Sequence, residues 1–373
     1  MKIGILTLPQ ETNYGGILQA FALQRTLRKL GHDAVTIDRH NHREYPSLKV
    51  HIAGFCKRLF QHYLQRKPNI STKWNPFASE KDYEKASLET QKFIDRNIRF
   101  TRRIFSDELP EIEKEYMFEA YVVGSDQVWL DKYCPASFLD FVHRPDVKRV
   151  TYAASCGKKS FFDNASKIAI CRELAQAFNG ISVREKQLID KCKQYLDVEA
   201  QWVLDPTMLL SPKEFLDATI SDVDEGAVLF SYILDANAEK NTMVKEIARK
   251  LNLPVVNGNR IHETGNAGKV YPSVDDWLQN INRASFVITD SFHGTVFSVL
   301  FNKPFLSICN TSRGINRFKS LLGMFELSDR LITSVDLDSA FNIVDTSINY
   351  ERVNRILNDE RTKSLHFLNK SLI

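Results

Sequence analysis

A histidine among small and polar residues is the strongest candidate for chemistry in this sequence. His293 stands between two apolar runs, residues 285–289 and 296–301, which predicts a strand that ends just before it and a helix that begins around it. The positive end of a helix favours a bound anion, and the anion in turn favours a protonated imidazole, so the position suits acid–base catalysis. A histidine that only packs in the core is the alternative. The neighbours of His293 complete this candidate: Asp290, Ser291, Phe292 and Gly294.

A second candidate lies near the amino end, where an apolar strand at residues 2–6 is expected to meet the start of a helix. Free backbone N–H groups at such a helix start can bind an anion, and glycine allows close approach to the backbone. The pattern matches neither the dinucleotide fingerprint nor the phosphate-binding loop with its lysine. A turn with a helix cap is the alternative. The segment consists of Asn13, Tyr14, Gly15 and Gly16.

A third candidate follows the apolar run 120–123, which reads as a buried strand. Ser125 and Asp126 come directly after it, and ligands of α/β proteins bind where parallel strands end. Asp126 is therefore expected either to act as a general base or, alternatively, to cap a helix.

An arginine follows a fourth strand-like run, residues 180–183. The guanidinium of Arg184 suits a carboxylate or a phosphate, because it offers two parallel hydrogen bonds. An ion pair with Glu185 or another acid is the alternative. Arg313 lies in the loop after a later strand and is expected to reach the same anion as His293.

Strand and helix patterns alternate along both halves of the chain, which predicts the α/β fold class with parallel sheets and right-handed crossovers. A polar stretch at 221–226 predicts a domain boundary, so we expect an N-terminal domain over 1–220, a C-terminal domain over 221–345 and, within 346–373, a terminal helix that docks across both. Two halves of similar size suggest a ligand cleft between them. Strands are expected at residues 2–6, 34–38, 120–123, 149–154, 180–183, 200–203, 228–233, 254–256, 285–289 and 304–308, and later helices at 239–251, 274–281 and 350–368.

Length and composition indicate an ordinary soluble enzyme with two domains. The chain has 373 residues, of which 43% are hydrophobic and 26% charged, and no apolar run approaches the roughly 20 residues that cross a bilayer. The start of the chain shows no signal-peptide cleavage site, so a cytoplasmic protein is expected. Its six cysteines form no Cys-x-x-Cys pair, which argues for reduced thiols, no structural metal and no cofactor.

Residues 39–118 interrupt the alternation and are expected to form a mainly helical insertion in the first domain. Within them, residues 39–108 hold 15 Lys and Arg against 8 Asp and Glu, a balance of +7, whereas the whole chain carries +4. Apolar residues recur there at helical spacing beside basic ones, which suits a helix lying on an anionic membrane, in peripheral contact with the inner surface. A core-packed helix is the alternative, and nucleic acid is not expected as a partner. The apolar residues are Ile52, Phe55, Cys56, Leu59, Phe60, Tyr63 and Leu64, and the basic ones Lys57, Arg58, Arg66 and Lys67.

The candidate segments, taken together, resemble those of the polysaccharide pyruvyl transferase family over about residues 1–325. The resemblance implies a pair of α/β domains like those of glycosyltransferase-B enzymes. It also implies transfer of the enolpyruvyl unit of phosphoenolpyruvate onto two hydroxyls of a sugar, giving a pyruvate ketal and phosphate. The matching segments, in order, are Asn13–Gly16 with Leu18–Ala20, Gly124–Trp129, Ser182–Glu185, Asp205–Thr207, and Asp290–Gly294 with Asn302–Pro304.

Three residues take family roles by this resemblance. Arg184 matches the donor-binding arginine, His293 the site histidine and Arg313 the late basic residue. Many relatives have Arg-Leu-His where this chain has Ser291, Phe292 and His293, so Arg313, Lys303 or Arg317 is expected to supply the missing charge.

The resemblance and the residues together predict a pyruvyl transferase that uses phosphoenolpyruvate to modify a sugar of a cell-envelope polysaccharide or of its nucleotide- or lipid-linked precursor. His293 is the expected proton donor, and Asp126 or Asp290 the expected base. Two alternatives stay open: a sugar-nucleotide-dependent glycosyltransferase, and a catalytically degenerate homologue that binds an anion without turnover.

Overall fold

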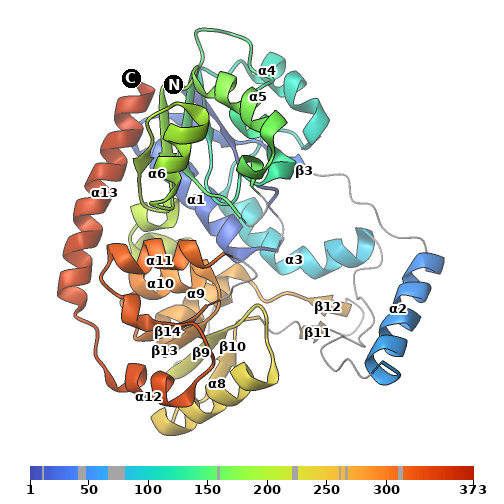
Figure 1. Ribbon diagram of the computed structural model, residues 1–373, viewed down its shortest axis with the longest axis vertical. Coiled ribbons are helices and arrows are strands. Elements are labelled where there is room, and N and C mark those ends of the chain that lie inside the picture. Colours follow the sequence, from blue (N-terminus) through green and yellow to red (C-terminus); the bar gives the residue numbers. More distant parts are fainter. Residues whose placement is uncertain are drawn as a thin grey trace.

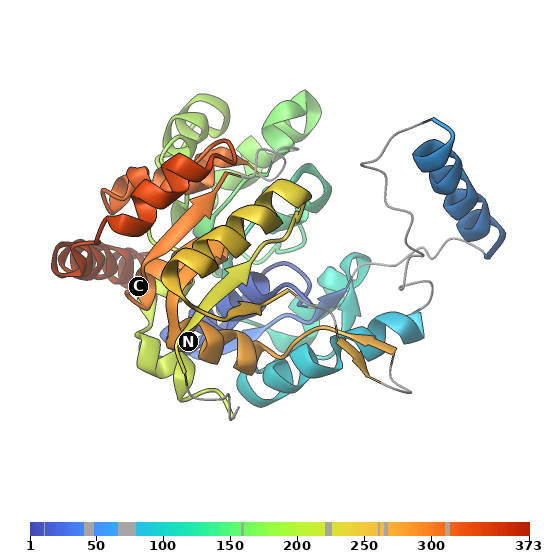
Figure 2. The same cartoon turned by 90° about the horizontal axis from the view of Figure 1, so that it is seen from below.

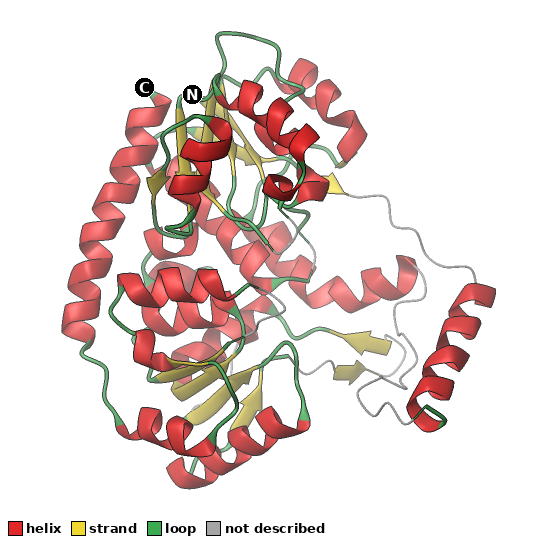
Figure 3. Ribbon diagram, in the orientation of Figure 1, coloured by secondary structure: helices red, strands yellow, loops and turns green. Residues whose placement is uncertain are grey.

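Two separate parallel sheets organise the chain, one in each half (Figure 1). The computed structural model describes residues 1–10, 12–40, 48–65, 80–157, 160–220, 226–259, 262–264, 268–309 and 314–373. The strands of each sheet lie between helices (Figure 3), as expected for buried parallel strands.

The first sheet has six strands in the order β2-β1-β5-β6-β7-β8. All its neighbouring pairs are parallel. The strand order reverses between β1 and β5, where an open α/β sheet leaves a crevice at its carboxyl edge. Its strands are β1 (Lys2–Leu6), β2 (Asp33–Thr36), β5 (Ala120–Val123), β6 (Lys148–Ala154), β7 (Gly180–Val183) and β8 (Gln201–Trp202).

The second sheet has five parallel strands in the order β10-β9-β13-β14-β15. Its order reverses between β9 and β13, so β13 occupies the position that β5 holds in the first sheet. Its strands are β9 (Val228–Tyr232), β10 (Val255–Asn257), β13 (Ala284–Thr289), β14 (Phe305–Ile308) and β15 (Leu331–Ile332).

Helices cover both sheets. In the first half they are α1 (Tyr14–Lys29), α5 (Ala165–Ala175), α6 (Leu188–Lys191) and α7 (Pro212–Leu216), and in the second α8 (Ala238–Leu251), α9 (Val274–Arg283), α10 (Phe292–Leu300), α11 (Ile315–Met324) and α12 (Leu337–Asp345). The short helices η2 (Asp131–Tyr133) and η6 (Pro206–Leu209) follow strands of the first sheet, and β11 (His262–Thr264) pairs with β12 (Gly268–Val270) outside both sheets.

One hydrophobic core joins the two halves. Tyr14, at the start of α1, packs against Tyr232 of β9 and Trp277 of α9, with ring centroids 5.9 Å and 5.7 Å away. Phe215 of α7 lies edge-on to Phe297 of α10 at 5.0 Å. Because the same apolar cluster contains residues of both sheets' helices, the carboxyl edges of the two sheets are held facing each other.

The expected insertion contains three helices with different surroundings: α2 (Leu48–Tyr63), α3 (Glu80–Asn97) and α4 (Leu109–Tyr116). It also holds the two short paired strands β3 (Arg39–His40) and β4 (Ile104–Phe105), of which β3 opens it. Helix α3 buries Phe93 and Ile94 in the shared core, and Arg96 forms a 2.6 Å ion pair with Asp275 of α9. Helix α2 stands apart from the body in both views (Figures 1 and 2).

The terminal helix α13 (Tyr350–Leu372) runs along both halves (Figure 1). Val353 and Leu357 enter the shared core, whereas Phe367 and Leu368 pack in the core of the first sheet. Most of the domain boundary expected at 221–226 lies outside the described residues, so its position stays a prediction.

Candidate active site

A cavity of about 980 Å³ lies where the carboxyl edges of the two sheets face each other. Both halves contribute to its wall, so its ligand would bridge the domains, as the reversed strand orders predict. Of the candidates from the sequence, those that line it are Asn13, Tyr14, Asp126, Asp290, Ser291, Phe292 and His293. Those that do not line it are Gly15, Gly16, Ser125, Arg184 and Gly294. Arg313 lies outside the described residues.

The turn between β13 and α10 places His293 in this wall. Ser291 is the N-cap of α10, and its Oγ accepts a 3.3 Å hydrogen bond from the Gly294 amide. The hydroxyl of Thr289 accepts one from the Ser291 amide at 3.0 Å. A Cβ at Gly294 would overlap the Thr289 side chain, so glycine is required for this turn to close. Ser291 and Gly294 therefore fix the backbone that carries His293.

The structure explains why position 15 is a glycine. A Cβ added at Gly15 would overlap the ring of His293, with Nδ1 as its nearest atom. The start of α1 in the first half and the start of α10 in the second thus meet at this imidazole. The sequence suggested close approach of a ligand to Gly15, and the structure shows close approach of His293 instead.

Two uncompensated helix starts face the cavity. Neither α1 nor α10 has an acidic residue in its first turn, so the positive end of each dipole is unopposed within its own helix. Asn13 is the N-cap residue of α1, but its side chain makes no capping bond to the helix and lines the cavity instead. An anion in the cavity would be attracted to both helix starts.

Asp126 reaches the cavity from the end of β5. Its backbone has a positive φ of 67°, in the left-handed region, and its side chain is nearly buried. The preceding Ser125 is held by Gln19 of α1, whose Oε1 accepts the Ser125 amide hydrogen at 2.8 Å. No described helix begins at Asp126, because η2 has Leu130 as its N-cap. The helix-cap alternative is therefore wrong.

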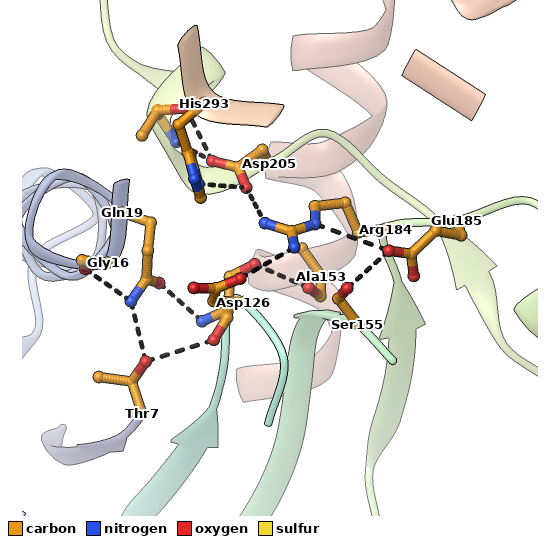
Figure 4. A network of polar contacts seen from close by, with 12 residues as sticks. Thr7, Gly16, Gln19, Asp126, Ala153, Ser155, Arg184, Glu185, Asp205 and His293 are labelled. Atoms are coloured by element: carbon orange, nitrogen blue, oxygen red, sulfur yellow. Dashed lines mark hydrogen bonds and ion pairs between the residues drawn. The ribbon is translucent and has the colours of Figure 1, made fainter. Parts of the chain in front are cut away.

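Arg184 lies behind the cavity wall rather than in it, which departs from the expected donor-binding role. Its guanidinium contacts Asp205 at 2.6 Å, Asp126 at 3.1 Å and Glu185 at 4.0 Å (Figure 4), and only 2% of its side chain is exposed. Burial lowers its pKa, but the three carboxylates outweigh burial and raise the pKa above its ordinary value. The alternative of an ion pair with acids describes the observed contacts.

Asp205 is the member of this network to which the sequence assigned no role. Its Oδ2 lies 3.5 Å from Nε2 of His293, which is buried without a hydrogen-bond partner in the described part of the chain. Burial raises the pKa of Asp205, yet His293 and Arg184 together hold it well below its usual range. Its position two residues after the predicted strand 200–203 was an available signal, because Asp126 follows a strand in the same way.

Asp126 shares this electrostatic environment. Burial raises its pKa, but attraction to Arg184 and then to His293 and Arg317 lowers it below the usual value. The carboxylate is therefore ionised at neutral pH, as a general base requires. One of its oxygens, Oδ1, accepts the hydrogen bond from Arg184.

Both carboxylate oxygens of Asp290 are engaged in structural contacts. Its Oδ1 accepts the Leu234 amide hydrogen at 2.6 Å, and its Oδ2 accepts those of Asp235 at 3.1 Å and of the Lys240 ammonium at 2.7 Å. Asp290 thus holds the loop after β9 in place. Although it borders the cavity, both of its oxygens already accept hydrogen bonds from the protein.

Arg317 is one of the expected sources of the charge that relatives carry as arginine at position 291. It lies in the first turn of α11, lines the cavity and stands 5.6 Å from the centre of the Phe292 ring. Lys303, another expected source of this charge, donates instead to the carbonyl of Asn282 and does not line the cavity. Lys132 of η2 adds a second cation from the first half.

Metal binding has no support in the described ranges, where no group of three or more His, Cys, Asp or Glu side chains is arranged to hold an ion. Nor is any helix in those ranges long and apolar enough to cross a bilayer.

The model of the family described as polysaccharide pyruvyl transferase matches residues 13–312. Among solved structures, a UDP-GlcNAc 2-epimerase from Neisseria meningitidis is similar with a TM-score of 0.52 and 10% identity, over 99% of this chain and 100% of the other. A 2-epimerase described as putative, from Listeria monocytogenes, has a TM-score of 0.51 and 9% identity, over 96% of this chain and 91% of the other. Comparison with curated proteins gives no match.

The two parallel sheets and the likeness to solved structures define a two-domain fold of the glycosyltransferase-B type, which confirms the expected fold. Within that class, the chain belongs to the polysaccharide pyruvyl transferase family and is a transferase, because the family model covers most of its length, including the segments around Asp126 and His293.

Proposed function

We propose that the protein transfers the enolpyruvyl unit of phosphoenolpyruvate to two hydroxyls of a sugar, forming a pyruvate ketal and releasing phosphate. The observation that carries this proposal is the meeting of His293 and Asp126, one from each half, at a single cavity that also holds two helix starts and Arg317. A donor with a phosphate and a carboxylate needs several positive or N–H donors, and this cavity supplies them.

The donor is proposed to bind through Arg317, Lys132 and the helix starts of α1 and α10. Arg184 acts indirectly in this proposal, because its hydrogen bonds are taken by Asp205 and Asp126. It fixes these two carboxylates so that Asp205 faces His293 and Asp126 faces the substrate. In this proposal Arg317, and not Arg184, is the arginine that binds the donor.

Proton transfer is assigned to His293 and Asp126. In this proposal His293 protonates the methylene carbon of the donor, which makes the adjacent carbon electrophilic. Asp126 accepts the proton of the attacking hydroxyl, and this proton replaces the one that His293 gave to the methylene carbon. Phosphate leaves with the electron pair of its C–O bond. A neighbouring hydroxyl then closes the ketal, and its proton goes to the released phosphate. Acid–base placement of this kind contributes about 100- to 10,000-fold in rate. No cofactor is needed.

The sugar acceptor is proposed to lie against the wall from the first half, next to Gln127 and Lys132. The cavity is large enough to leave room for the carrier of this sugar, which is proposed to be a nucleotide or a lipid. A cell-envelope polysaccharide precursor made on the cytoplasmic side is the corresponding biological substrate class.

The test is an assay of phosphate release from phosphoenolpyruvate with a panel of hexosides that carry free hydroxyl pairs, with mass spectrometry of the product. We expect ketal formation by the wild type and a loss of about 100- to 10,000-fold in His293→Ala. His366→Ala, a change at an exposed histidine of α13, is the matched control. Unimpaired activity of His293→Ala would reject the assigned role.

The same panel with UDP-sugars separates this function from nucleotide-dependent glycosyl transfer. UDP release in place of phosphate release would favour a glycosyltransferase. Calorimetric binding of phosphoenolpyruvate without turnover on any acceptor would favour the degenerate, anion-binding homologue.

A further inference from the structure

Asp205 is a buried carboxylate that faces His293 from behind the cavity wall (Figure 4). Only 1% of its side chain is exposed, and it does not line the cavity, so it acts on a ligand only through other residues. Its Oδ1 accepts the amide hydrogen of Thr207 at 3.0 Å and the hydroxyl hydrogen of the same residue at 2.7 Å. Its Oδ2 accepts a hydrogen bond from Arg184 at 2.6 Å and lies 3.5 Å from Nε2 of His293. Because both oxygens are held, the carboxylate has one orientation, which turns Oδ2 towards the imidazole.

The imidazole of His293 is enclosed by residues of the first half. A Cβ added at Gly15 would lie 2.0 Å from Nδ1, so the start of α1 packs against this edge of the ring. Nε2 is buried on the side of Asp205, and 7% of the whole side chain is exposed. Shape alone does not fix such a ring, because turning it over exchanges nitrogen and carbon positions at almost the same volume. A carboxylate distinguishes the two orientations, because it attracts an N–H more strongly than a C–H.

The charges around this ring add to the attraction. Burial raises the pKa of Asp205, but His293 and Arg184 lower it well below its usual range, so the carboxylate is ionised at neutral pH. Arg184 faces three carboxylates, and its single positive charge does not balance them. Asp126 is one of the three, and its pKa is also raised by burial and lowered by Arg184 and by His293. Negative charge is therefore in excess beside the ring, and Oδ2 of Asp205 brings it to 3.5 Å from Nε2.

From this geometry we propose that Asp205 is a positioning residue for His293: it accepts a hydrogen bond from Nε2–H and so fixes the orientation of the ring. The partner of one ring nitrogen commonly decides the tautomer and direction of a histidine in this way. At 3.5 Å the two groups are at ion-pair distance, and catalytic hydrogen bonds often tighten only when a substrate is bound. The inference rests on the proposed function, in which His293 is the acid, and it assigns the residue that holds this acid in place.

Nuclear magnetic resonance of the full chain without substrate tests where the proton lies. With isotope-labelled histidine, the signals of His293 are assigned by their absence from His293→Gln. We expect a proton on Nε2 that resonates downfield and exchanges slowly, because it is hydrogen-bonded to a buried carboxylate. In Asp205→Asn this signal should move upfield or disappear. A wild type whose Nε2 carries no proton, or the same signal in wild type and Asp205→Asn, would overturn the inference.

Kinetics test whether Asp205 acts through His293. Asp205→Asn should lower kcat for ketal formation by about 10- to 100-fold, because a misplacement of about 1 Å can cost about 100-fold. KM for phosphoenolpyruvate should change little, because Asp205 does not line the cavity. In the His293→Ala background, Asp205→Asn should have no further effect, because residues that act as a unit are not additive. An equal loss in both backgrounds would show that Asp205 does not act through the ring, and would overturn the inference.

The matched control is Ser364→Ala in α13. It removes a 3.0 Å hydrogen bond from the amide of Leu204, next to Asp205, and leaves the carboxylate in place, so the His293 signal and kcat should be retained. If this control loses as much as Asp205→Asn, the segment and not the carboxylate is responsible, and the inference is overturned. Thermal unfolding checks the fold of each variant, and the proton position in the wild type decides the question if Asp205→Asn does not fold. A wild type that forms no ketal would reject the proposed function, whereas the resonance measurement would still test the contact between Asp205 and His293.

Discussion

Asp126 and Asp290 occupy corresponding places in the two halves of the molecule. Each follows the central strand at which its sheet reverses order, and each borders the cavity. Their surroundings differ. Asp290 receives two backbone amides and the ammonium of Lys240, whereas Asp126 receives one hydrogen bond from Arg184.

The difference shows that a position at the end of a strand does not by itself decide the function of a carboxylate. At Asp290, the donors around the carboxylate use its lone pairs for structure. At Asp126, the partner is a guanidinium that holds one oxygen and keeps the carboxylate ionised, and the other oxygen is the one proposed to meet the substrate. The role follows from the donors that other segments bring to the carboxylate.

The largest effect is expected from Asp126→Asn. An amide does not accept the hydroxyl proton, so ketal formation should fall by about 100- to 10,000-fold. Arg184 keeps Asp205 as a partner, so the protein should still fold. Phosphate-release kinetics measure the activity, and thermal unfolding measures the stability of the fold. If activity survives, Asp126 is no more functional than Asp290 and the comparison fails.

Asp290→Asn should mainly cost stability. It leaves the largely buried Lys240 ammonium without its carboxylate, and breaking a buried ion pair from one side costs about 3 to 5 kcal/mol. Urea unfolding measures this loss. The chemistry per folded molecule should change far less than in Asp126→Asn.

The double variant Asp290→Asn/Lys240→Met sharpens this expectation. It removes the unpaired ammonium as well, so it should recover part of the stability lost in Asp290→Asn. A double variant as unstable as the single one would show that the two backbone amides, and not Lys240, account for the contribution of Asp290.

Gly15→Ala should reduce turnover by about 10- to 100-fold. The new methyl group overlaps the His293 ring, and a misplacement of about 1 Å can cost about 100-fold. Gly16→Ala is the control, because a Cβ there would meet only the flexible side chain of Asn13 at 3.3 Å. Equal loss in both variants would mean that the helix start, and not the ring, is disturbed.

The smallest expected effect is on how far the free energy of unfolding falls in acid. The folded-state pKa values of Asp126 and Asp205 are lowered, so their stabilising contribution is present above the ordinary carboxyl pKa, about 4, and is lost as pH falls through the lowered values. Asp205→Asn should therefore lose less stability than the wild type between pH 5 and pH 3. Urea unfolding across this range measures the slope, and equal slopes would contradict it.

Much of the fold follows from local patterns. The runs 120–123 and 180–183 coincide with β5 and β7, and the helices expected at 239–251 and 274–281 lie within α8 and α9. Apolar runs and capping residues act within a few positions of one another, so they can be read along the chain.

The candidate site was predicted less completely. His293 and Asp126 were expected at strand ends and lie at one cavity. Arg184 was expected on the donor, but its acidic partners Asp126 and Asp205 are 58 and 21 residues away in the sequence. Nothing local distinguishes a free arginine from one that folding surrounds with carboxylates.

The sequence by itself determined the order of strands and helices, the residues that end each strand, and the family to which these residues point. Only the tertiary structure decided that both oxygens of Asp290 accept hydrogen bonds, that Asp205 faces His293, and that α3 buries one face in the shared core. The reason is physical: hydrophobic periodicity is a local property, whereas the charge, burial and hydrogen bonding of a side chain depend on segments that only folding brings to it.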